Sequence, residues 1–305
     1  MPTAAVVGGG SLGMLLAGRL AASGCDTELW TRTSEQAARI NSEGLTVESE
    51  TGQAVIRAEV KAVPINEAAF FKNGPILLAL KQTALTPDFL ERFARIVPDD
   101  ATVALFQNGI GHVEKLQLAL PGRNLVVAIT TEAAQRIDSV TVRHTGRGET
   151  RLGNVTEDSG GHDQDLEDLL KQAGFSVSLS KQVREAMLRK LLINAVINPL
   201  TAILRVKNGE LTQSPERLHL MKALFLETYE ILTPHGLGDE AELWNHVLQV
   251  CDATKANRSS MLQDVSLHKE TEIESINGQI CRLASEQGKP APWNTAVTTL
   301  VKAVD

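Results

Sequence analysis

The sequence predicts an α/β protein with an N-terminal Rossmann-type parallel sheet and an all-helical C-terminal domain. Up to about residue 180, short β-rich runs alternate with helical patterns, as they do in parallel α/β sheets. A glycine-rich segment follows the first of these runs directly. Beyond Lys181 the strand signals end, and apolar positions at helical spacing continue almost to the last residue. The predicted domains are therefore residues 1–180 and 181–305.

The first predicted domain alternates strands with helices. The expected strands are Ala4–Val7, Asp26–Trp30, Ile76–Leu80, Thr102–Phe106 and Leu125–Thr130. The expected helices between them are Leu12–Ser23, Ser34–Ser42, Thr86–Ile96 and Gly111–Leu118. The pattern then predicts a hairpin of Val140–Thr145 with Glu149–Leu152 that closes the sheet. A turn at Ser159–Gly161, a helix at Gln164–Ala173 and a short strand at Phe175–Leu179 are expected after it.

In the second predicted domain, apolar periodicity predicts helices at Leu218–Leu232, Ala241–Asp252 and Ile273–Glu286. The spacing of Thr271 and Glu274 fits a capping box for the last of these helices. Another helix is expected to begin within Ser259–Asp264. A buried helix around Arg189–Leu200 is expected to kink or end at Asn198, because the proline at position 199 disfavours a helical conformation there.

The composition is that of a globular protein, with 43% hydrophobic and 22% charged residues. A net charge of −7 argues against a nucleic-acid or acidic-membrane partner. The three cysteines, Cys25, Cys251 and Cys281, are too few and too scattered for a disulfide framework or a zinc site, so we expect no metal and a cytoplasmic location. The apolar run Leu191–Leu204 contains two asparagines and a proline, and we expect it to be too short to span a bilayer.

The segment Gly8, Gly9, Gly10, Ser11, Leu12 and Gly13 matches G-x-G-x-x-G, the fingerprint of dinucleotide-binding loops. The match alone is weak, but here it follows a predicted strand directly and opens a predicted helix. In that setting glycines allow a tight turn and a close approach of the backbone to a pyrophosphate at the helix N-terminus. The alternative is a glycine-rich turn without a ligand, which this context disfavours.

The residue after the second strand distinguishes NAD from NADP. An NAD site expects Asp or Glu there for the ribose 2′-hydroxyl. This chain has Arg32, whose guanidinium pairs well with a 2′-phosphate, unless Arg32 is an ordinary solvated residue. Glu28 lies too early, within the strand. The sequence therefore favours NADP, with NADPH as its reduced form.

Two further polar residues, Lys81 and Asn108, follow predicted strands at their carboxyl ends, where open α/β sheets bind ligands. Gly109 and Gly111 let the backbone turn tightly beside a bound molecule. Either polar residue alone would more often be a surface side chain. Their position on the same edge as the glycine loop favours ligand contact.

Lys190, Asn194 and Asn198 are spaced i, i+4, i+8 and project from one side of a helix. The residues between them are apolar, so the helix is expected to be buried, where lysine and asparagine are costly without partners. Either the asparagines bond to backbone and the lysine reaches solvent, or the stripe faces a cleft and presents the lysine to a substrate. Spacing alone assigns Ser260 to a helix cap and Glu272 to a helix's first turn.

Together these motifs closely resemble the ketopantoate reductase (2-dehydropantoate 2-reductase) family over nearly the whole chain. Besides the glycine loop, the resemblance rests on Leu80-Lys81, Gln107–Gly111, Arg189–Leu191, Asn198–Ala202, Asn208–Leu211, Ser259–Asp264, Thr271–Ile273 and Ile276–Gly278. Gln107 and Trp293 depart slightly from the family pattern. Neither touches the expected chemistry, but related 2-keto acid reductases share much of the pattern.

The resemblance implies a role for each site residue. Arg32 and Lys81 would lie at the 2′-phosphate, and Asn108 and the backbone near Ala134 beside the nicotinamide half of the cofactor. Lys190 matches the family's proton donor. The residues that match substrate-binding positions are Asn108, Asn194, Asn198, Asn208 and Ser260, and Glu272 matches an acidic residue at the junction of cofactor and substrate.

The implied reaction is reduction of the C2 ketone of 2-dehydropantoate by NADPH, which yields pantoate for pantothenate (vitamin B5) and coenzyme A biosynthesis. The active site is expected in a cleft between the domains. Two alternatives stay open: a related NADP-dependent reductase of another 2-keto acid, and a non-catalytic NADP-binding sensor. The Lys-Asn-Asn stripe argues against the sensor, which needs no proton donor. The expected partner is a small 2-keto acid, and a homodimer is possible.

Overall fold

The protein is described by a computed structural model that covers residues 2–52, 55–154 and 162–304. The chain forms two compact units. One consists of Met1–Gln107 and His112–Val183, and the other of Asn108–Gly111 and Arg184–Asp305. The turn predicted at Ser159–Gly161 lies outside the described residues.

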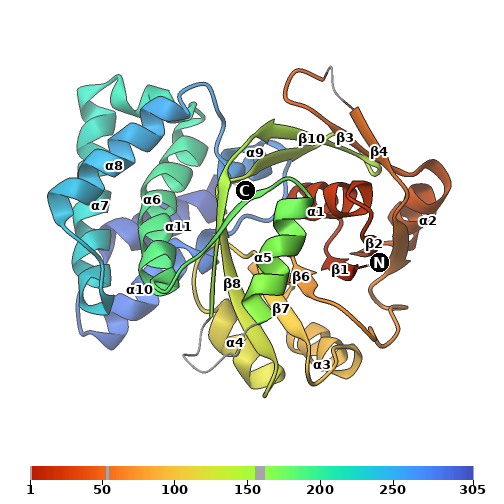
Figure 1. The fold of residues 1–305 in the computed structure, drawn as a ribbon. Coiled ribbons are helices and arrows are strands. Elements are labelled where there is room, and N and C mark those ends of the chain that lie inside the picture. Colours follow the sequence, from red (N-terminus) through yellow and green to blue (C-terminus); the bar gives the residue numbers. More distant parts are fainter. Residues whose placement is uncertain (1, 53–54, 155–161, 305) are drawn as a thin grey trace. The chain divides into compact units, whose positions relative to one another are not determined.

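The first unit contains an eight-stranded sheet in the order β12-β11-β8-β7-β6-β1-β2-β5 (Figure 1). All its neighbours are parallel except the antiparallel pair β8 and β11. Six neighbouring strands of this sheet, in the order β5-β2-β1-β6-β7-β8, have the Rossmann order, which confirms the predicted fold class. The strands are β1 (Thr3–Val7), β2 (Asp26–Thr31), β5 (Lys61–Pro64), β6 (Ile76–Leu78), β7 (Thr102–Leu105), β8 (Asn124–Thr130), β11 (Glu149–Asn154) and β12 (Ser176–Leu179).

Helices connect these strands at the predicted places. Two of them begin at threonine caps: the side chain of Thr33 accepts a hydrogen bond from the Gln36 N–H, and that of Thr86 from the Phe89 N–H. The helices of this unit are α1 (Ser11–Ala22), α2 (Ser34–Glu43), α3 (Pro87–Ile96), α4 (His112–Ala119) and α5 (His162–Gln172), with a 3₁₀ turn η1 at Gln82–Ala84.

A second, four-stranded sheet in the order β4-β3-β10-β9 curves over helix α1 (Figure 1). Helix α1 contacts strands of both sheets. At Gly18 a Cβ atom would lie 2.5 Å from Val47 Cγ2, so only glycine permits this close packing. The strands are β3 (Leu45–Glu48), β4 (Val55–Ala58), β9 (Ala133–Arg136) and β10 (Thr141–Gly146), and only β10 was predicted.

The predicted hairpin of Val140–Thr145 with Glu149–Leu152 is wrong. Strand β10 pairs with β3 and β9 in the small sheet, whereas β11 pairs with β8 and β12 in the large one. The chain passes from one sheet to the other at Gly148, where a Cβ atom would lie 2.3 Å from the Thr131 carbonyl carbon. The glycines therefore mark a crossing between sheets and not a hairpin turn.

The second unit is helical around a core of its own, as predicted (Figure 1). Its central helix α6 carries fully buried residues such as Leu192, Ala195 and Val196. The helices are α6 (Val183–Leu204), α7 (Pro215–Leu232), α8 (Glu240–Ala253), α9 (Ser260–Ser266), α10 (Asn277–Glu286) and α11 (Pro292–Val304). Three 3₁₀ turns lie between them, η2 (Asn208–Thr212), η3 (Thr233–His235) and η4 (Ile273–Ser275).

The predicted helix Ile273–Glu286 is confirmed over Asn277–Glu286, but its predicted start and the capping box at Thr271 are wrong. The short turn η4 ends at Ser275. The next residue, Ile276, has a φ of −109° and a ψ of −89°, which interrupt the helical geometry, and α10 begins only at Asn277. The last helix, α11, was not predicted. The carboxylate of Glu227 accepts hydrogen bonds from the backbone N–H groups of its residues 293 and 294 and thereby caps it.

The sequence predicted a kink or an end of the helix at Asn198. Helix α6 does not end there but continues through Pro199 to Leu204. Proline has no N–H, so the carbonyl of Ala195 lacks its helical donor. The side-chain amide of Asn277 donates a hydrogen bond to that carbonyl at 2.9 Å and replaces the missing donor. Helix α6 is long and apolar enough to cross a membrane, with a mean hydropathy of 1.4, but 61% of that stretch is buried inside the protein, as in a core helix.

Replacement of Asn277 by alanine is expected to lower the free energy of unfolding by about 1–3 kcal/mol, because the buried Ala195 carbonyl then has no donor. Denaturant unfolding measures this loss. In a Pro199→Ala background the restored N–H can bond to Ala195, so the same replacement should cost less there. Equal losses in both backgrounds would show that the Asn277 amide does not replace the N–H donor that Pro199 lacks.

Candidate functional site

The glycine loop joins β1 to α1 at the carboxyl edge of the large sheet. The Gly8 N–H donates to the Trp30 carbonyl at 2.8 Å, and Gly8 has a φ of +119°, which favours glycine. A Cβ atom on Gly13 would lie 1.8 Å from the Gly8 oxygen, and one on Gly9 would lie 2.5 Å from Gln36 Oε1. Side chains at these positions would therefore disrupt the loop.

The N-terminus of α1 presents donors to open space. Its N-cap residue is Gly10, which has no side chain to accept from the first N–H groups, and the first turn contains no acidic residue. A Cβ atom on Gly10 would meet nothing within 4 Å. Among the described residues these first N–H groups have no hydrogen-bond acceptor, and together with the positive end of the helix dipole they suit a pyrophosphate group.

Other predicted cofactor residues follow the neighbouring parallel strands. Arg32 directly follows β2 and is exposed, and Lys81 follows β6 at the start of η1 and is half-buried. Strands β2, β1 and β6 are adjacent and parallel, so the loops after them lie at one edge. Glu28 lies within β2 and is paired with Lys61 at 2.7 Å. Ala134, in β9, is half-buried against the core of this unit.

In the second unit, Lys190, Glu272 and Asn108 come together. The Asn108 amide, 164 positions away in sequence, donates to Glu272 Oε2 at 3.1 Å. Burial lowers the pKa of the Lys190 ammonium from 10.5 to about 8, and the negative charge of Glu272 acts in the opposite direction. Glu272 is only 9% exposed. A half-buried lysine with a desolvated ammonium is thus held beside a buried carboxylate.

Asn194 and Asn198 lie one and two turns after Lys190 on the same side of α6. Asn194 is half-buried, and Asn198 is 8% exposed. Within the part of the chain that the structure describes, neither side-chain amide forms a hydrogen bond, so the alternative in which both bond to backbone is not supported. Both amides remain suited to a ligand.

Asn208 has a polar atom without a partner. Its amide nitrogen donates to Thr254 Oγ1 at 2.9 Å, but its Oδ1 is buried and accepts no hydrogen bond from the described residues. Such an atom is costly unless a ligand or water supplies a donor. The backbone N–H of Asn208 donates to the Asn257 carbonyl at 3.1 Å, which places it beside the loop before α9.

Ser259, and not Ser260, caps helix α9, because its hydroxyl accepts from the Leu262 N–H at 3.0 Å. The same hydroxyl lies 2.7 Å from Thr201 Oγ1 on α6. This contact holds the start of α9 next to the end of α6 that carries Asn198. Ser260, the first residue of α9, is exposed and is not needed as the cap.

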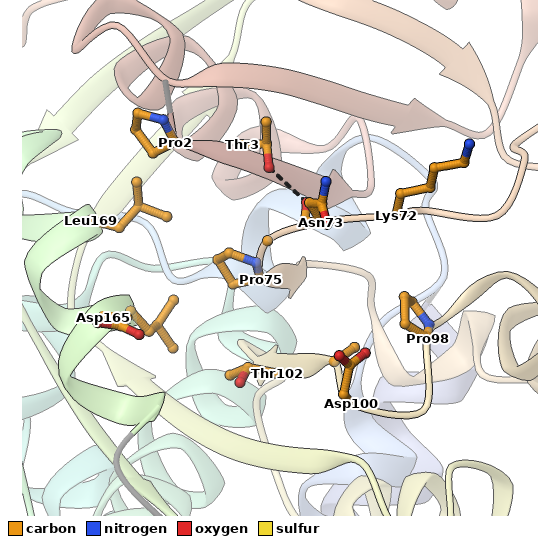
Figure 2. Close-up of a pocket in the computed structure, with 13 residues that line it drawn as sticks. Pro2, Thr3, Lys72, Asn73, Pro75, Pro98, Asp100, Thr102, Asp165 and Leu169 are labelled. Carbon is orange, nitrogen blue, oxygen red and sulfur yellow. Dashed lines mark hydrogen bonds between the residues drawn. The ribbon is translucent and has the colours of Figure 1, made fainter.

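A cavity of about 360 Å³ lies at the opposite, amino edge of the large sheet (Figure 2). Its wall includes Thr3, whose hydroxyl donates to the Asn73 carbonyl at 2.7 Å, and the carboxylates Asp100 and Asp165. None of the predicted site residues lines it. Sequence reasoning did miss two side chains at the glycine loop, Gln36 and Arg136, because no local motif connects them to it.

The Rossmann-type sheet, its open glycine loop and the lysine of the helical unit define a nicotinamide-dinucleotide-dependent oxidoreductase. The family model described as ketopantoate reductase PanE/ApbA matches residues 4–157, and that of its C terminal part matches residues 182–305. The chain belongs to this family.

Individual relatives agree with this assignment. The chain is 35% identical to the 2-dehydropantoate 2-reductase of Bacillus subtilis, over 98% of this chain and 96% of that protein. The crystal structure of a probable 2-dehydropantoate 2-reductase from Bacillus subtilis matches with a TM-score of 0.85 and 32% identity, over 99% of this chain and 100% of that one. D-mandelate dehydrogenase with NADH and anilino(oxo)acetate shares the fold, with a TM-score of 0.92 and 24% identity over 99% of this chain and 98% of that one.

Proposed function

We propose that the protein reduces 2-dehydropantoate to pantoate with NADPH, in pantothenate and coenzyme A biosynthesis in the cytoplasm. The observation that carries the proposal is the position of Lys190 beside Glu272, with a pKa lowered to about 8. Helix α6, which carries Lys190, also presents two asparagines on the same side. When bound, NADPH supplies the hydride that reduces the ketone carbon.

Lys190 acts on the ketone oxygen. This oxygen gains negative charge as the carbon is reduced, so an ammonium aimed at it stabilises the transition state more than the ground state. The same ammonium then gives its proton to the oxygen. A pKa of about 8 keeps Lys190 largely protonated at neutral pH and makes it a stronger acid than an ordinary lysine.

The polar residues near Lys190 orient the substrate. Asn194 and Asn198 provide amides for the carboxylate and ketone groups without adding an opposing charge, and the Ser260 hydroxyl is available in the same way. The unpartnered Oδ1 of Asn208 accepts from a substrate hydroxyl. Each of these groups is neutral, so Lys190 remains the cation that selects an anionic keto acid.

The cofactor residues fall into three groups, one for each part of the dinucleotide. The loop from Gly8 to Gly13 holds the pyrophosphate, and Arg32 with Lys81 holds the 2′-phosphate. The backbone near Ala134, together with Asn108 and Glu272, contacts the nicotinamide half. Glu272 has a second role, because its charge opposes the effect of burial on Lys190.

The absorbance of NADPH, followed with purified protein and a series of 2-keto acids, tests this function. We expect 2-dehydropantoate to give the highest kcat/KM of the series. A higher value with another 2-keto acid would favour the related reductase instead. Tight NADPH binding without oxidation by any of these acids would favour the sensor.

The pH dependence of kcat/KM is expected to reflect the pKa of Lys190. The proton donor must be charged, so kcat/KM should be constant below pH of about 8 and fall about tenfold per pH unit above it. In Glu272→Gln the pKa of Lys190 should be lower still, and the fall should begin at lower pH. The control is Glu274→Gln, whose carboxylate pairs with Lys302, and its profile should match wild type.

The predicted homodimer is a separate proposal. Light scattering during size-exclusion chromatography measures the mass directly, and a dimer should give twice the 32.9 kDa of the chain. A mass of one chain over the whole working concentration range would contradict it.

A further inference from the structure

Strand β9 brings an arginine onto the glycine loop. The backbone N–H of Arg136, the last residue of β9, donates to Ser11 Oγ at 3.0 Å, and its Nη1 donates to the Gly9 carbonyl at 3.2 Å. Its Nε donates to the Asp138 carbonyl at 2.9 Å, which fixes the guanidinium plane. Arg136 therefore contacts the loop through both its main chain and its side chain.

The Gly9 carbonyl accepts from a second side chain. Gln36 is 5% exposed, and its Nε2 donates to Gly9 O at 2.9 Å and to the Ser139 carbonyl at 3.2 Å. In a trans peptide the C=O and the following N–H point in opposite directions. With Gly9 O held towards Gln36 and Arg136, the N–H of Gly10 is directed away from both side chains.

The contact with Ser11 has a similar consequence. A hydroxyl has one proton to donate and two lone pairs to accept with. Because Ser11 Oγ accepts from the Arg136 N–H, its own proton remains for another acceptor. Ser11 is the first residue of α1, at the positive end of the helix dipole. The Gly10 N–H and the Ser11 O–H are thus two oriented donors, and the guanidinium adds positive charge nearby.

We propose that Arg136 is a positioning residue for the cofactor, which holds the glycine loop in the conformation that binds the pyrophosphate. This inference rests on the proposed use of a nicotinamide dinucleotide. NADPH and NADH both contain the pyrophosphate, so Arg136 contributes equally to the binding of both. Arg32, proposed for the 2′-phosphate, contributes to NADPH alone.

Direct binding titrations of the Arg136→Met variant test the inference without any turnover. The probes are NADPH, NADH and adenosine 2′-monophosphate, which has the 2′-phosphate but no pyrophosphate. We expect Kd to rise about five- to tenfold for both dinucleotides, as for the loss of one charge-assisted hydrogen bond at a partly exposed site, and to stay unchanged for the monophosphate. Arg136→Lys keeps the charge but not the planar set of donors of the guanidinium. Its Kd for each dinucleotide should therefore lie between those of wild type and Arg136→Met.

The matched control is Arg143→Met, on the neighbouring strand β10, where Arg143 pairs with Glu48 at 2.7 Å. All three dissociation constants should equal those of wild type. The inference is overturned if Arg136→Met binds both dinucleotides normally, or if it loses the monophosphate to the same extent, or if the control shows the same losses. Wild-type protein that binds neither dinucleotide would overturn the proposed function itself.

Discussion

Replacement of Lys190 by alanine is expected to lower kcat by about 10²- to 10⁴-fold, the range over which a positioned general acid accelerates a reaction. The variant loses both the charge that stabilises the developing oxyanion and the proton that neutralises it. Stopped-flow or steady-state absorbance of NADPH measures kcat. NADPH binding, titrated separately, should change little, because the cofactor residues proposed for the glycine loop are intact.

Two further variants sharpen this result. Lys190→Arg keeps a positive charge, but the pKa of a guanidinium is far above that of Lys190, so the variant should restore charge stabilisation without efficient proton donation and give an intermediate kcat. Lys222→Ala removes a lysine of the same unit that pairs with Glu240, and its kcat should match wild type. Turnover of Lys190→Ala near the wild-type rate would remove the lysine from the mechanism.

Replacement of Arg32 by alanine is expected to raise the Kd of NADPH about 10- to 100-fold and to leave that of NADH nearly unchanged. The guanidinium can form two charge-assisted hydrogen bonds to a phosphate, and NADH has no 2′-phosphate to receive them. Titration of both cofactors gives the selectivity directly. The ratio of the two constants is the informative quantity, because a general disturbance of the fold would change both.

The control for Arg32 is Arg151→Ala, which removes an exposed arginine of β11 that pairs with Glu149 at 3.3 Å. It should bind NADPH as wild type does, which excludes a mere loss of net positive charge as the cause. Equal losses of NADPH and NADH affinity in Arg32→Ala would contradict the phosphate assignment.

The glycine loop and the Lys190 stripe could be predicted because each is a local pattern. In the loop, three glycines stand between a strand and a helix, and in the stripe, polar residues recur every four positions. The structure places the loop at the strand edge and Lys190 beside Glu272. The roles of the individual residues remain predictions, as do the functions of the two domains.

The small sheet and the details of the helical unit could not be predicted, because they depend on partners distant in sequence. Strand β3 has four residues and pairs with β10, with Thr46 opposite Thr141. Such a short run carries little periodicity of its own. The continuation of α6 through its proline likewise depends on a side chain 82 positions beyond the carbonyl it serves.

The assignment of Asn108–Gly111 to the helical unit bears on how the gene could be divided. A fragment beginning at Arg184 would contain the lysine but not Asn108, the amide that donates to Glu272. It would also lack Ile110, whose N–H donates to the Ser275 carbonyl at 3.4 Å. The helical half, expressed separately, would therefore be incomplete, and it would recover its full set of contacts only through a segment encoded in the other half.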